Sequence, residues 1–240
     1  MDELTVHRAL YRPGRLLDIG AHDGLLTLPL STLPGAMVEA FEPLPAAHAR
    51  LATATAGRAN IRLHACALAE RDGTAELEMP SVGGVAQEQW ASLVKDYAAI
   101  QAWDPRLERI DRFEVELKRL DGFAWPDITG IKLDVEGAEE EVIRGGAATI
   151  RACLPVMTVE IEERHRVGST RAVPALLAAL GLAGFFWLDG WHEVSAFNAA
   201  HMQVASPSPA NFAASDPYVF IFHFVPPALV PALLALRPTG

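Results

Sequence analysis

Residues 131–137 read Ile-Lys-Leu-Asp-Val-Glu-Gly, and this heptad decides the fold class. Apolar and ionisable residues alternate along it with a period of two, which is typical of a β-strand. Gly137 interrupts the alternation, and a helix is predicted over Ala138–Ile150. A strand–turn–helix unit of this kind builds parallel sheets whose interior strands are buried on both faces.

The polar face of the heptad carries Lys132, Asp134 and Glu136. Ionisable groups in a buried strand cost free energy unless they pair with each other or face a site. Ligands of such folds bind beyond the carboxyl ends of the strands, where Asp134 and Glu136 are expected. The alternative is a structural pair of Lys132 with Asp134 or Glu136. A site is favoured because two acids and one base leave unpaired charge, and perturbed acids cluster in sites.

Strands and helices alternate along the rest of the chain, which predicts a doubly wound α/β sheet. The last strand follows an irregular polar stretch and is expected to run antiparallel at or near an edge. The strand after residue 73 is expected to form a hairpin with the third strand. The predicted further strands are Arg15–Gly20, Ala36–Phe41, Ile61–Ala65, Thr74–Met79, Phe113–Leu120, Pro155–Ile161, Phe185–Leu188 and Tyr218–Phe224. The predicted further helices are Leu25–Leu33, Pro45–Ala56, Arg171–Leu180 and Ala228–Leu236.

Length and composition predict one domain over residues 1–240. Half of the residues are apolar and 21% are charged, as in ordinary globular proteins. Residues 81–112 depart from the strand–helix rhythm and are interpreted as an inserted lid or substrate segment. Residues 225–240 form an apolar C-terminal tail, and this tail and the aromatic last strand are expected to offer a homodimer interface.

The net charge, 20 − 30 = −10, argues against nucleic acid or an anionic membrane as partner, because both need a basic surface. Two cysteines, Cys66 and Cys153, suit a reducing compartment. The N-terminus lacks the apolar run of a signal peptide. The longest uncharged run, Ala172–Leu188, is shorter than the roughly 20 residues of a membrane helix. A cytoplasmic location is therefore predicted.

A second motif, residues 17–24, reads Leu-Asp-Ile-Gly-Ala-His-Asp-Gly and combines a strand end with a glycine turn. A helix after such a turn offers free N–H groups to an anion. His22 and Leu25 stand where a dinucleotide fingerprint has glycine, so a smaller anion such as an amino-acid carboxylate fits better. Asp18 is placed to accept from an ammonium group. The alternative is a plain turn with a capping Asp.

Two further acids follow predicted strands. Glu42 comes 42 − 20 = 22 residues after Gly20, and an acid about 20 residues past the glycine turn binds ribose hydroxyls in nucleoside-cofactor folds. Glu160 ends its strand and is expected beside Asp134 and Glu136. The alternatives are a solvated loop acid for Glu42 and a rim charge for Glu160.

No metal site is predicted. The histidines show no ligand spacing; those considered are His7, His48, His64, His165, His192, His201 and His223. The chain also lacks a nucleophile elbow and a P-loop.

Together these motifs resemble the FkbM family of class I S-adenosylmethionine-dependent methyltransferases over roughly residues 15–162. The resemblance rests on the glycine-turn motif, on Glu-Ala-Phe-Glu-Pro at 39–43, on Ala-Cys-Ala-Leu-Ala-Glu-Arg-Asp-Gly at 65–73, on Leu120-Asp121, and above all on Ile-Lys-Leu-Asp-Val-Glu-Gly-Ala-Glu followed by Val-Ile-Arg-Gly-Gly. It implies a mostly parallel seven-stranded sheet with an antiparallel late strand. It also implies O-methylation of a hydroxyl on a small molecule or carbohydrate.

The resemblance implies a role for each matching residue. The catalytic residues would be Asp134 and Glu136 near the transferred methyl. The residue pattern itself adds Lys132, which would keep the catalytic acid ionised, and Glu160 beside the two acids. The cofactor-binding residues would be Asp18, Gly20 and Ala21 at the methionine part, His22 and Gly24 in the same turn, Glu42 and Pro43 at the ribose, and Cys66 and Ala67 beside the adenine. The family often has Asn at the position of His22, so His22 is expected to reach the ligands differently.

Three other functions compete with this prediction. Methylation of a protein or nucleic acid is one, and the acidic charge disfavours nucleic acid. A non-catalytic S-adenosylmethionine-binding scaffold is another, and the four retained acids Asp18, Glu42, Asp134 and Glu136 weigh against it. A nicotinamide-dependent enzyme is disfavoured by His22 and Leu25.

Overall fold

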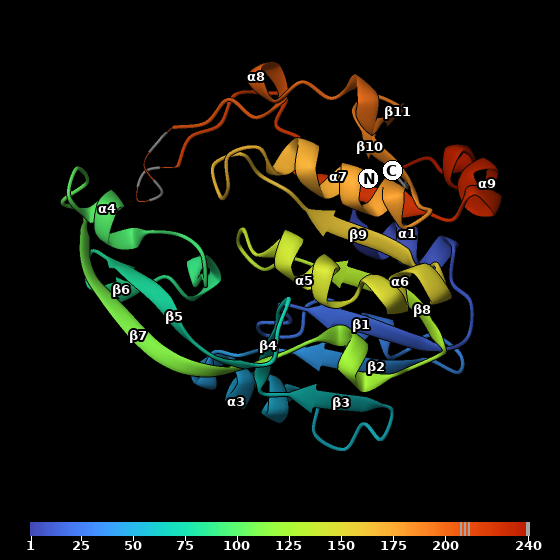
Figure 1. The fold of residues 1–240 in the computed structure, drawn as a ribbon, viewed down its shortest axis with the longest axis horizontal. Coiled ribbons are helices and arrows are strands. Elements are labelled where there is room, and N and C mark those ends of the chain that lie inside the picture. The colour runs from blue at the N-terminus through green and yellow to red at the C-terminus, as the bar shows by residue number, and fades with distance from the viewer. Residues whose placement is uncertain (207, 209, 211, 239–240) are drawn as a thin grey trace.

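The core of the fold is one large mixed sheet, shown in Figure 1. The computed structural model describes residues 1–206, 208, 210 and 212–238. In that part of the chain the sheet has eight strands. In spatial order they are β11 (Trp191–Glu193), β10 (Ala183–Trp187), β12 (Ile221–Val225), β9 (Val156–Glu160), β8 (Ile128–Leu133), β1 (Arg15–Ile19), β2 (Met37–Phe41) and β3 (Ile61–His64).

The direction of the chain across the sheet reverses between β1 and β8. From β1 it continues through β2 to β3, whereas β8 is followed by β9 on the other side, and all these pairs are parallel. Asp18 in β1 lies opposite Lys132 in β8, and Lys132 lies opposite Thr158 in β9. Ligands in open α/β sheets bind at such a reversal, beyond the carboxyl ends of the strands.

The antiparallel late strand is confirmed, but its expected place at or near an edge is wrong. β12 lies between β9 and β10 and runs antiparallel to both. Phe222 and Phe224 are fully buried, because the strand is covered on both faces. The short β11 at the edge is an eighth strand beyond the seven expected.

Helices cover both faces of the sheet. On one face, Leu17, Ile131 and Val159 pack with apolar residues of α5, α6 and α7. On the other, Leu16 and Val38 pack against α2, and α1 and α9 cover β9, β10 and β12. The helices are α1 (Glu3–Ala9), α2 (Thr27–Leu30), α3 (Pro45–Ala54), α4 (Tyr97–Gln101), α5 (Glu139–Gly145), α6 (Ala147–Cys153), α7 (Ser169–Ala179), α8 (Ala199–Met202) and α9 (Val230–Ala235), with 3₁₀ turns at Glu88–Trp90, Leu120–Phe123, Val194–Ala196 and Pro227–Leu229.

Two predicted helices differ from those observed. Of the helix expected over Leu25–Leu33, only the four residues of α2 are helical. After Ser31 the backbone N–H groups donate to carbonyl oxygens three residues earlier, as in a turn, instead of four. The helix expected over Ala138–Ile150 is divided into α5 and α6. A Cβ on Gly145 would lie 1.9 Å from the carbonyl oxygen of Ala69, so only glycine allows this close approach of two backbones.

A second sheet extends from the carboxyl-end side of the main sheet, at the lower left of Figure 1. The predicted hairpin with the third strand is wrong, because the strand after residue 73 pairs antiparallel with β7 over almost its whole length. The second sheet consists of β4 (Cys66–Leu68), β7 (Leu107–Lys118), β5 (Gly73–Val82) and β6 (Val85–Ala86). The expected lid segment is thus the far end of this sheet together with α4.

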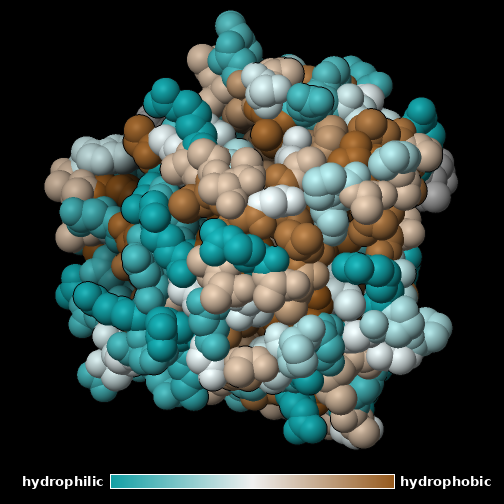
Figure 2. Space-filling view, turned by 45° about the vertical axis from the view of Figure 1, so that its right-hand side comes forward, coloured by the Kyte–Doolittle hydropathy of each residue, from teal (hydrophilic) through white to brown (hydrophobic). Residues whose placement is uncertain are grey.

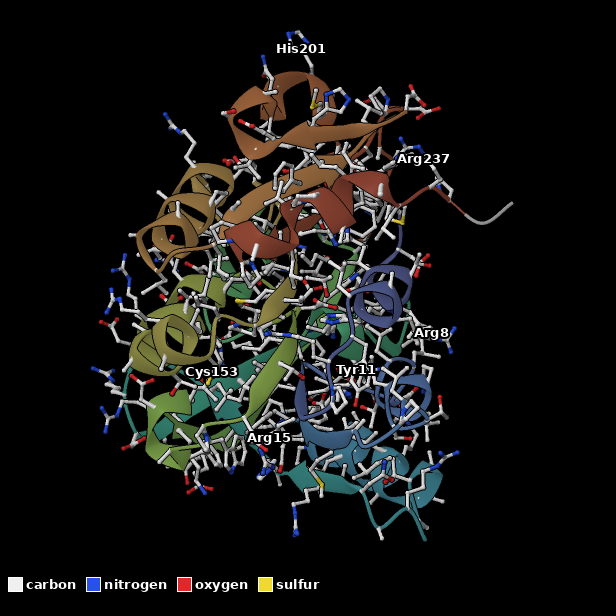
Figure 3. All side chains as sticks on the ribbon, turned by 90° about the vertical axis from the view of Figure 1, so that its right-hand side faces the viewer. Arg8, Tyr11, Arg15, Cys153, His201 and Arg237 are labelled. Atoms are coloured by element: carbon white, nitrogen blue, oxygen red, sulfur yellow. The ribbon has the colours of Figure 1, made fainter. Side chains whose placement is uncertain are left out.

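Figure 3 looks at the opposite, amino-terminal ends of the parallel strands, where Tyr11, Arg15 and Cys153 lie. On the face shown in Figure 2, hydrophobic patches are interrupted by hydrophilic residues. Phe222 and Phe224 of the aromatic last strand belong to the interior and are therefore not available to a dimer interface. The homodimer itself stays a prediction. The tail packs through Leu233, which is fully buried, and its residues 239 and 240 lie outside the described part of the chain. Among the described residues, no helix combines the length and apolarity needed to cross a membrane.

The buried His223 in β12 predicts a pH dependence of stability. Burial lowers the pKa of His223 from 6.5 to about 3. Below pH 6.5 the unfolded chain therefore takes up a proton that the folded chain does not, so stability is lost as the pH falls from 6.5 towards 3. We expect the free energy of unfolding of the wild type, minus that of His223→Phe, to fall by up to about 1.4 kcal/mol per pH unit in this window.

The difference between the two proteins cancels the titration of groups that do not interact with His223. Urea unfolding at several pH values between 4 and 7.5 measures it, and His201→Phe at an exposed position is the matched control. A pH slope for His223→Phe that equals the wild-type slope would contradict this expectation.

Candidate active site

A cavity of about 380 Å³ opens at the carboxyl ends of β1 and β8. Its position is the chain reversal at which ligands of such sheets bind. Its volume lies in the range of small-molecule and cofactor sites. Among the residues named from the sequence, it is lined by Asp18, Gly20, Ala21, His22, Glu42, Pro43, Cys66, Ala67, Lys132, Asp134, Glu136 and Glu160.

Lys132 is the buried cation at the base of this cavity. Its Nζ lies 3.5 Å from Asp18 Oδ1 and 3.5 Å from Asp134 Oδ2, and donates to Gly20 O at 2.5 Å. Burial alone would lower the pKa of Lys132, but Asp134 and Asp18 outweigh burial and raise it. The structural pair of Lys132 with Asp134 therefore exists, whereas Lys132 forms no ion pair with Glu136 among the described residues.

Asp18 keeps one oxygen available to a ligand. Its Oδ2 accepts from Thr27 Oγ1 at 2.5 Å. Its Oδ1 is buried and accepts no hydrogen bond from the described residues. A buried carboxylate oxygen without a donor is costly, so a cationic donor in the cavity would complete the site.

The glycine turn does not form the expected cradle for an anion. The N–H groups of Gly20 and Ala21 both donate to Phe41 O, at 3.1 and 3.0 Å. The N–H of His22 donates to Glu42 Oε2 at 2.8 Å, and α2 starts only at Thr27. These donors are used inside the protein, so the turn shapes the cavity wall rather than binding an anion through them.

Gly24 and His22, both predicted to bind the cofactor from the glycine turn, differ in whether they line the cavity. Gly24 does not line the cavity; it has a φ of +82°, and a Cβ there would lie 2.7 Å from the Cδ1 of Leu51. His22 does line the cavity, with a φ of +46°. Its Nε2 faces Glu88 Oε2 at 3.5 Å.

Glu42 is almost fully buried and is held by two backbone donors. Leu44 N donates to Oε1 and His22 N to Oε2, each at 2.8 Å. Burial raises the pKa of Glu42, and these hydrogen bonds oppose the rise. A carboxylate offers about four lone-pair sites, so each oxygen can accept one further hydrogen bond from a ligand.

The cavity wall beside Glu42 is apolar. Cys66 and Ala67 belong to β4 itself, are both buried, and burial raises the pKa of the Cys66 thiol to about 11. Leu68 and Leu77 continue the same wall. A flat aromatic group such as adenine suits these surroundings.

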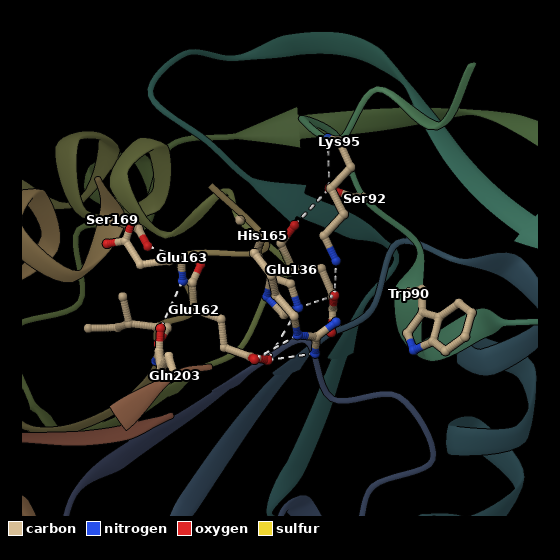
Figure 4. Close-up of polar contacts among 12 residues, drawn as sticks. Trp90, Ser92, Lys95, Glu136, Glu162, Glu163, His165, Ser169 and Gln203 are labelled. Atoms are coloured by element: carbon tan, nitrogen blue, oxygen red, sulfur yellow. Dashed lines mark hydrogen bonds and ion pairs between the residues drawn. The ribbon is translucent and has the colours of Figure 1, made fainter. Parts of the chain in front are cut away.

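The other end of the cavity is built around Glu136, as Figure 4 shows. The predicted strand stops at Leu133, so Glu136 lies in the following turn with a φ of +55°. Ser92 Oγ donates to Glu136 O at 2.8 Å, and the Lys95 ammonium contacts the Glu136 carboxylate. Burial raises the pKa of Glu136 to about 7, although Lys95 opposes the rise.

Glu160 stands beside Glu136, as expected. Burial, followed by repulsion from Asp134 and Glu136, raises its pKa to about 10. Next to it, the Glu162 carboxylate accepts from Arg164 at 2.6 Å and also contacts the Tyr218 hydroxyl. Of these two acids at the end of β9 and just after it, Glu160 lines the cavity.

The predicted lid segment forms one side of the cavity. Glu88, Gln89, Ala91 and Leu93 all line it. Arg50 ties this side to the glycine turn, because its Nε donates to Asp23 Oδ1 at 2.8 Å and its guanidinium also contacts Glu88.

Sequence reasoning missed three residues of this site. Glu3 of α1 lines the cavity, and burial raises its pKa to about 7. Lys95 and His165 both reach Glu136. A signal existed only for His165, because it follows Glu160 and Glu162 directly after a predicted strand end.

A doubly wound sheet with an antiparallel interior strand, and a cavity lined by acids at its chain reversal, define a class I methyltransferase architecture. A family model, the methyltransferase FkbM domain, matches residues 18–185, well over half of the chain. The chain is 30% identical over 203 residues to the 2-O-methyltransferase NoeI of Sinorhizobium fredii (strain NBRC 101917 / NGR234). The matched region covers 76% of this chain and 81% of NoeI.

Among solved structures, the chain is similar to the methyltransferase FkbM from Methylobacillus flagellatus KT, with a TM-score of 0.53 and 14% identity. The match covers 92% of this chain but 50% of that one, so the chain spans about half the length of that relative. A precorrin-6y C5,15-methyltransferase from Geobacter metallireducens GS-15 matches with a TM-score of 0.47 and 15% identity, over 93% of this chain and 87% of that one. The chain belongs to the FkbM methyltransferase family.

Proposed function

We propose that this protein transfers the methyl group of S-adenosylmethionine to a hydroxyl of a small molecule or carbohydrate. The observation that carries the proposal is the buried Oδ1 of Asp18, which accepts no hydrogen bond from the described residues and lies in a cavity at the chain reversal of an FkbM-family fold. The whole chain would act as one methyltransferase domain. The cytoplasmic location predicted from the sequence stays a prediction.

The residues of the cavity fit the proposed donor. Asp18 Oδ1 would accept from the ammonium of the methionine part. The two oxygens of Glu42, fixed by the Leu44 and His22 N–H groups, would accept from the ribose hydroxyls. Cys66 and Ala67 would flank the adenine. In this order Asp134 and Glu136 would lie at the reactive end of the donor.

When bound, S-adenosylmethionine would supply a methyl group on a positively charged sulfur. An acceptor oxygen would bond to that methyl in line as the C–S bond breaks, and the electron pair of that bond would stay on sulfur. The protein contributes mainly alignment, which can be worth about 7–11 kcal/mol. Glu136 and Glu160 line the cavity where the acceptor would enter, so a carboxylate there would orient the acceptor hydroxyl and take its proton. Lys132 would keep Asp134 ionised.

The proposed acceptor is a hydroxyl of a small molecule or carbohydrate. The relative named 2-O-methyltransferase supports a hydroxyl acceptor. The lid segment around Trp90 and residues 189–217 would select it, and positions 207, 209 and 211 of the latter lie outside the described residues. The charge of −10 favours a small molecule or carbohydrate over nucleic acid.

Asp18→Asn is expected to weaken binding of S-adenosylhomocysteine by about 10- to 100-fold, because hydrogen bonds to charged groups are worth about 1.5–3 kcal/mol. Asn keeps the size of Asp18 and an acceptor for Thr27, but loses the charge that would hold the ammonium. Calorimetric titration of the two proteins measures the ratio of their dissociation constants.

Asp127→Asn is the matched control. Asp127 also pairs with a cation, Arg15 Nε at 3.1 Å, but at the opposite end of the sheet. The affinity of the Asp127→Asn protein for S-adenosylhomocysteine should equal that of the wild type. Equal affinities for Asp18→Asn and the wild type would contradict the proposed role of Asp18.

A further inference from the structure

We propose that Glu136, Glu160 and His165 form a binding site for one divalent metal cation at the acceptor end of the cavity. The three residues come from different places in the chain: the turn after β8, the end of β9 and the loop that follows β9. They meet beside the cavity, which Glu136 and Glu160 line. Figure 4 shows His165 directed at Glu136.

The distances suit a shared cation. One ligand atom from each residue lies within 4.8 Å of the others. His165 Nε2 lies 3.2 Å from Glu136 Oε2. Ligands bound at about 2.1 Å in an octahedral site lie about 3.0 Å apart when adjacent and about 4.2 Å apart when opposite, so only a small contraction would be needed.

His165 points independently to a ligand. The residue is 8% exposed, and its Nε2 forms no hydrogen bond with any described residue. That nitrogen faces Glu136 Oε2 and, at 3.3 Å, Glu162 Oε1. A buried polar nitrogen without a hydrogen bond is costly, and a metal–nitrogen bond would satisfy it.

The charges around the site also favour a cation. Lys95 contacts Glu136 and Arg164 pairs with Glu162. Glu160 has no ion pair with any described residue, although it lies among the other acids. A divalent cation would bind this carboxylate and would share Glu136 Oε2 with Lys95, because Lys95 Nζ and His165 Nε2 both approach that oxygen.

The ligand set indicates the kind of metal. Carboxylate oxygens suit Mg²⁺ and Mn²⁺, whereas imidazole suits Zn²⁺ and other transition metals. One imidazole with two carboxylates therefore favours a transition-metal ion such as Mn²⁺ or Zn²⁺ over Mg²⁺. Its role would be to bind the acceptor oxygens; this role rests on the proposed methyl transfer, but the binding of the cation does not.

Titration with MnCl₂ tests the site, because free Mn²⁺ gives an electron paramagnetic resonance signal that binding broadens. We expect one Mn²⁺ per chain, displaced by Zn²⁺ more readily than by Mg²⁺. His165→Gln and Glu160→Gln should each weaken Mn²⁺ binding by about tenfold or more, given that even residues outside the ligand shell change metal affinity by about 10–100-fold.

His201→Gln and Glu114→Gln, at exposed positions, are the controls and should bind Mn²⁺ as the wild type does. Circular dichroism checks that each variant is folded. Absence of Mn²⁺ and Zn²⁺ binding, or equal binding by wild type, His165→Gln and Glu160→Gln, would overturn the site. S-adenosylhomocysteine is titrated into the same samples. Binding of S-adenosylhomocysteine without metal binding would contradict the metal site alone, whereas absence of S-adenosylhomocysteine binding would contradict the proposed function.

Discussion

Replacing Lys132 with methionine is expected to lower the free energy of unfolding by about 3–5 kcal/mol, because removal of one partner leaves a buried charge uncompensated. Asp18, which is 1% exposed, would lose its neighbouring cation, and Gly20 O would lose its donor. Methionine fills most of the space of the lysine stem, so the loss would be electrostatic. Urea unfolding of the two proteins at neutral pH measures the difference.

Lys118→Met is the matched control, since Lys118 pairs with Glu116 at the surface. Exposed pairs are worth less than about 1 kcal/mol, and a loss of that size is expected here. The double variant Lys132→Met/Asp18→Asn should recover part of the stability, because it also removes the stranded charge. A loss for Lys132→Met no larger than that for Lys118→Met would contradict the ionic role of Lys132.

Glu136→Gln is expected to reduce turnover at least 100-fold while leaving the affinity for S-adenosylhomocysteine within a few-fold of wild type. A positioned base contributes about 10²–10⁴-fold, and Glu136 lies at the acceptor end rather than beside Glu42. The amide keeps the shape of the side chain but neither accepts a proton nor neutralises Lys95. The rate of S-adenosylhomocysteine formation, measured for both proteins with the same acceptor, gives the change in turnover.

Glu140→Gln serves as the comparison for Glu136→Gln. Glu140 belongs to the same acidic stretch but pairs with Arg144 on α5, so near-wild-type turnover is expected. Wild-type-like turnover of Glu136→Gln itself would remove Glu136 from the mechanism.

Alternation of residues predicted the parallel strands well, because local period and burial agree there. The heptad predicted β8. The acids at the predicted strand ends, Asp18, Glu42, Asp134 and Glu160, were predicted as site residues, and all four line one cavity. The position of β12 was not predictable in this way. A strand's neighbours depend on the path of the whole chain, and its apolar run is equally compatible with an edge or an interior place.

Contacts distant in sequence account for most of the other errors. β5 pairs with β7 across the whole lid segment rather than with nearby β3. Lys95 reaches Glu136 from 41 residues away, with no spacing that marks it. The glycine turn shows a different limit, because its N–H groups donate to Phe41 O and to Glu42. These partners lie at the last residue of the neighbouring strand β2 and directly after it.

Calorimetric titration of the wild-type protein with S-adenosylhomocysteine and, separately, with NAD tests most directly whether the cavity at the β1–β8 reversal is a methyl-donor site. The predicted result is binding of one S-adenosylhomocysteine per chain and no detectable binding of NAD. Binding of NAD alone, or of neither ligand, would contradict a methyltransferase function for this cavity.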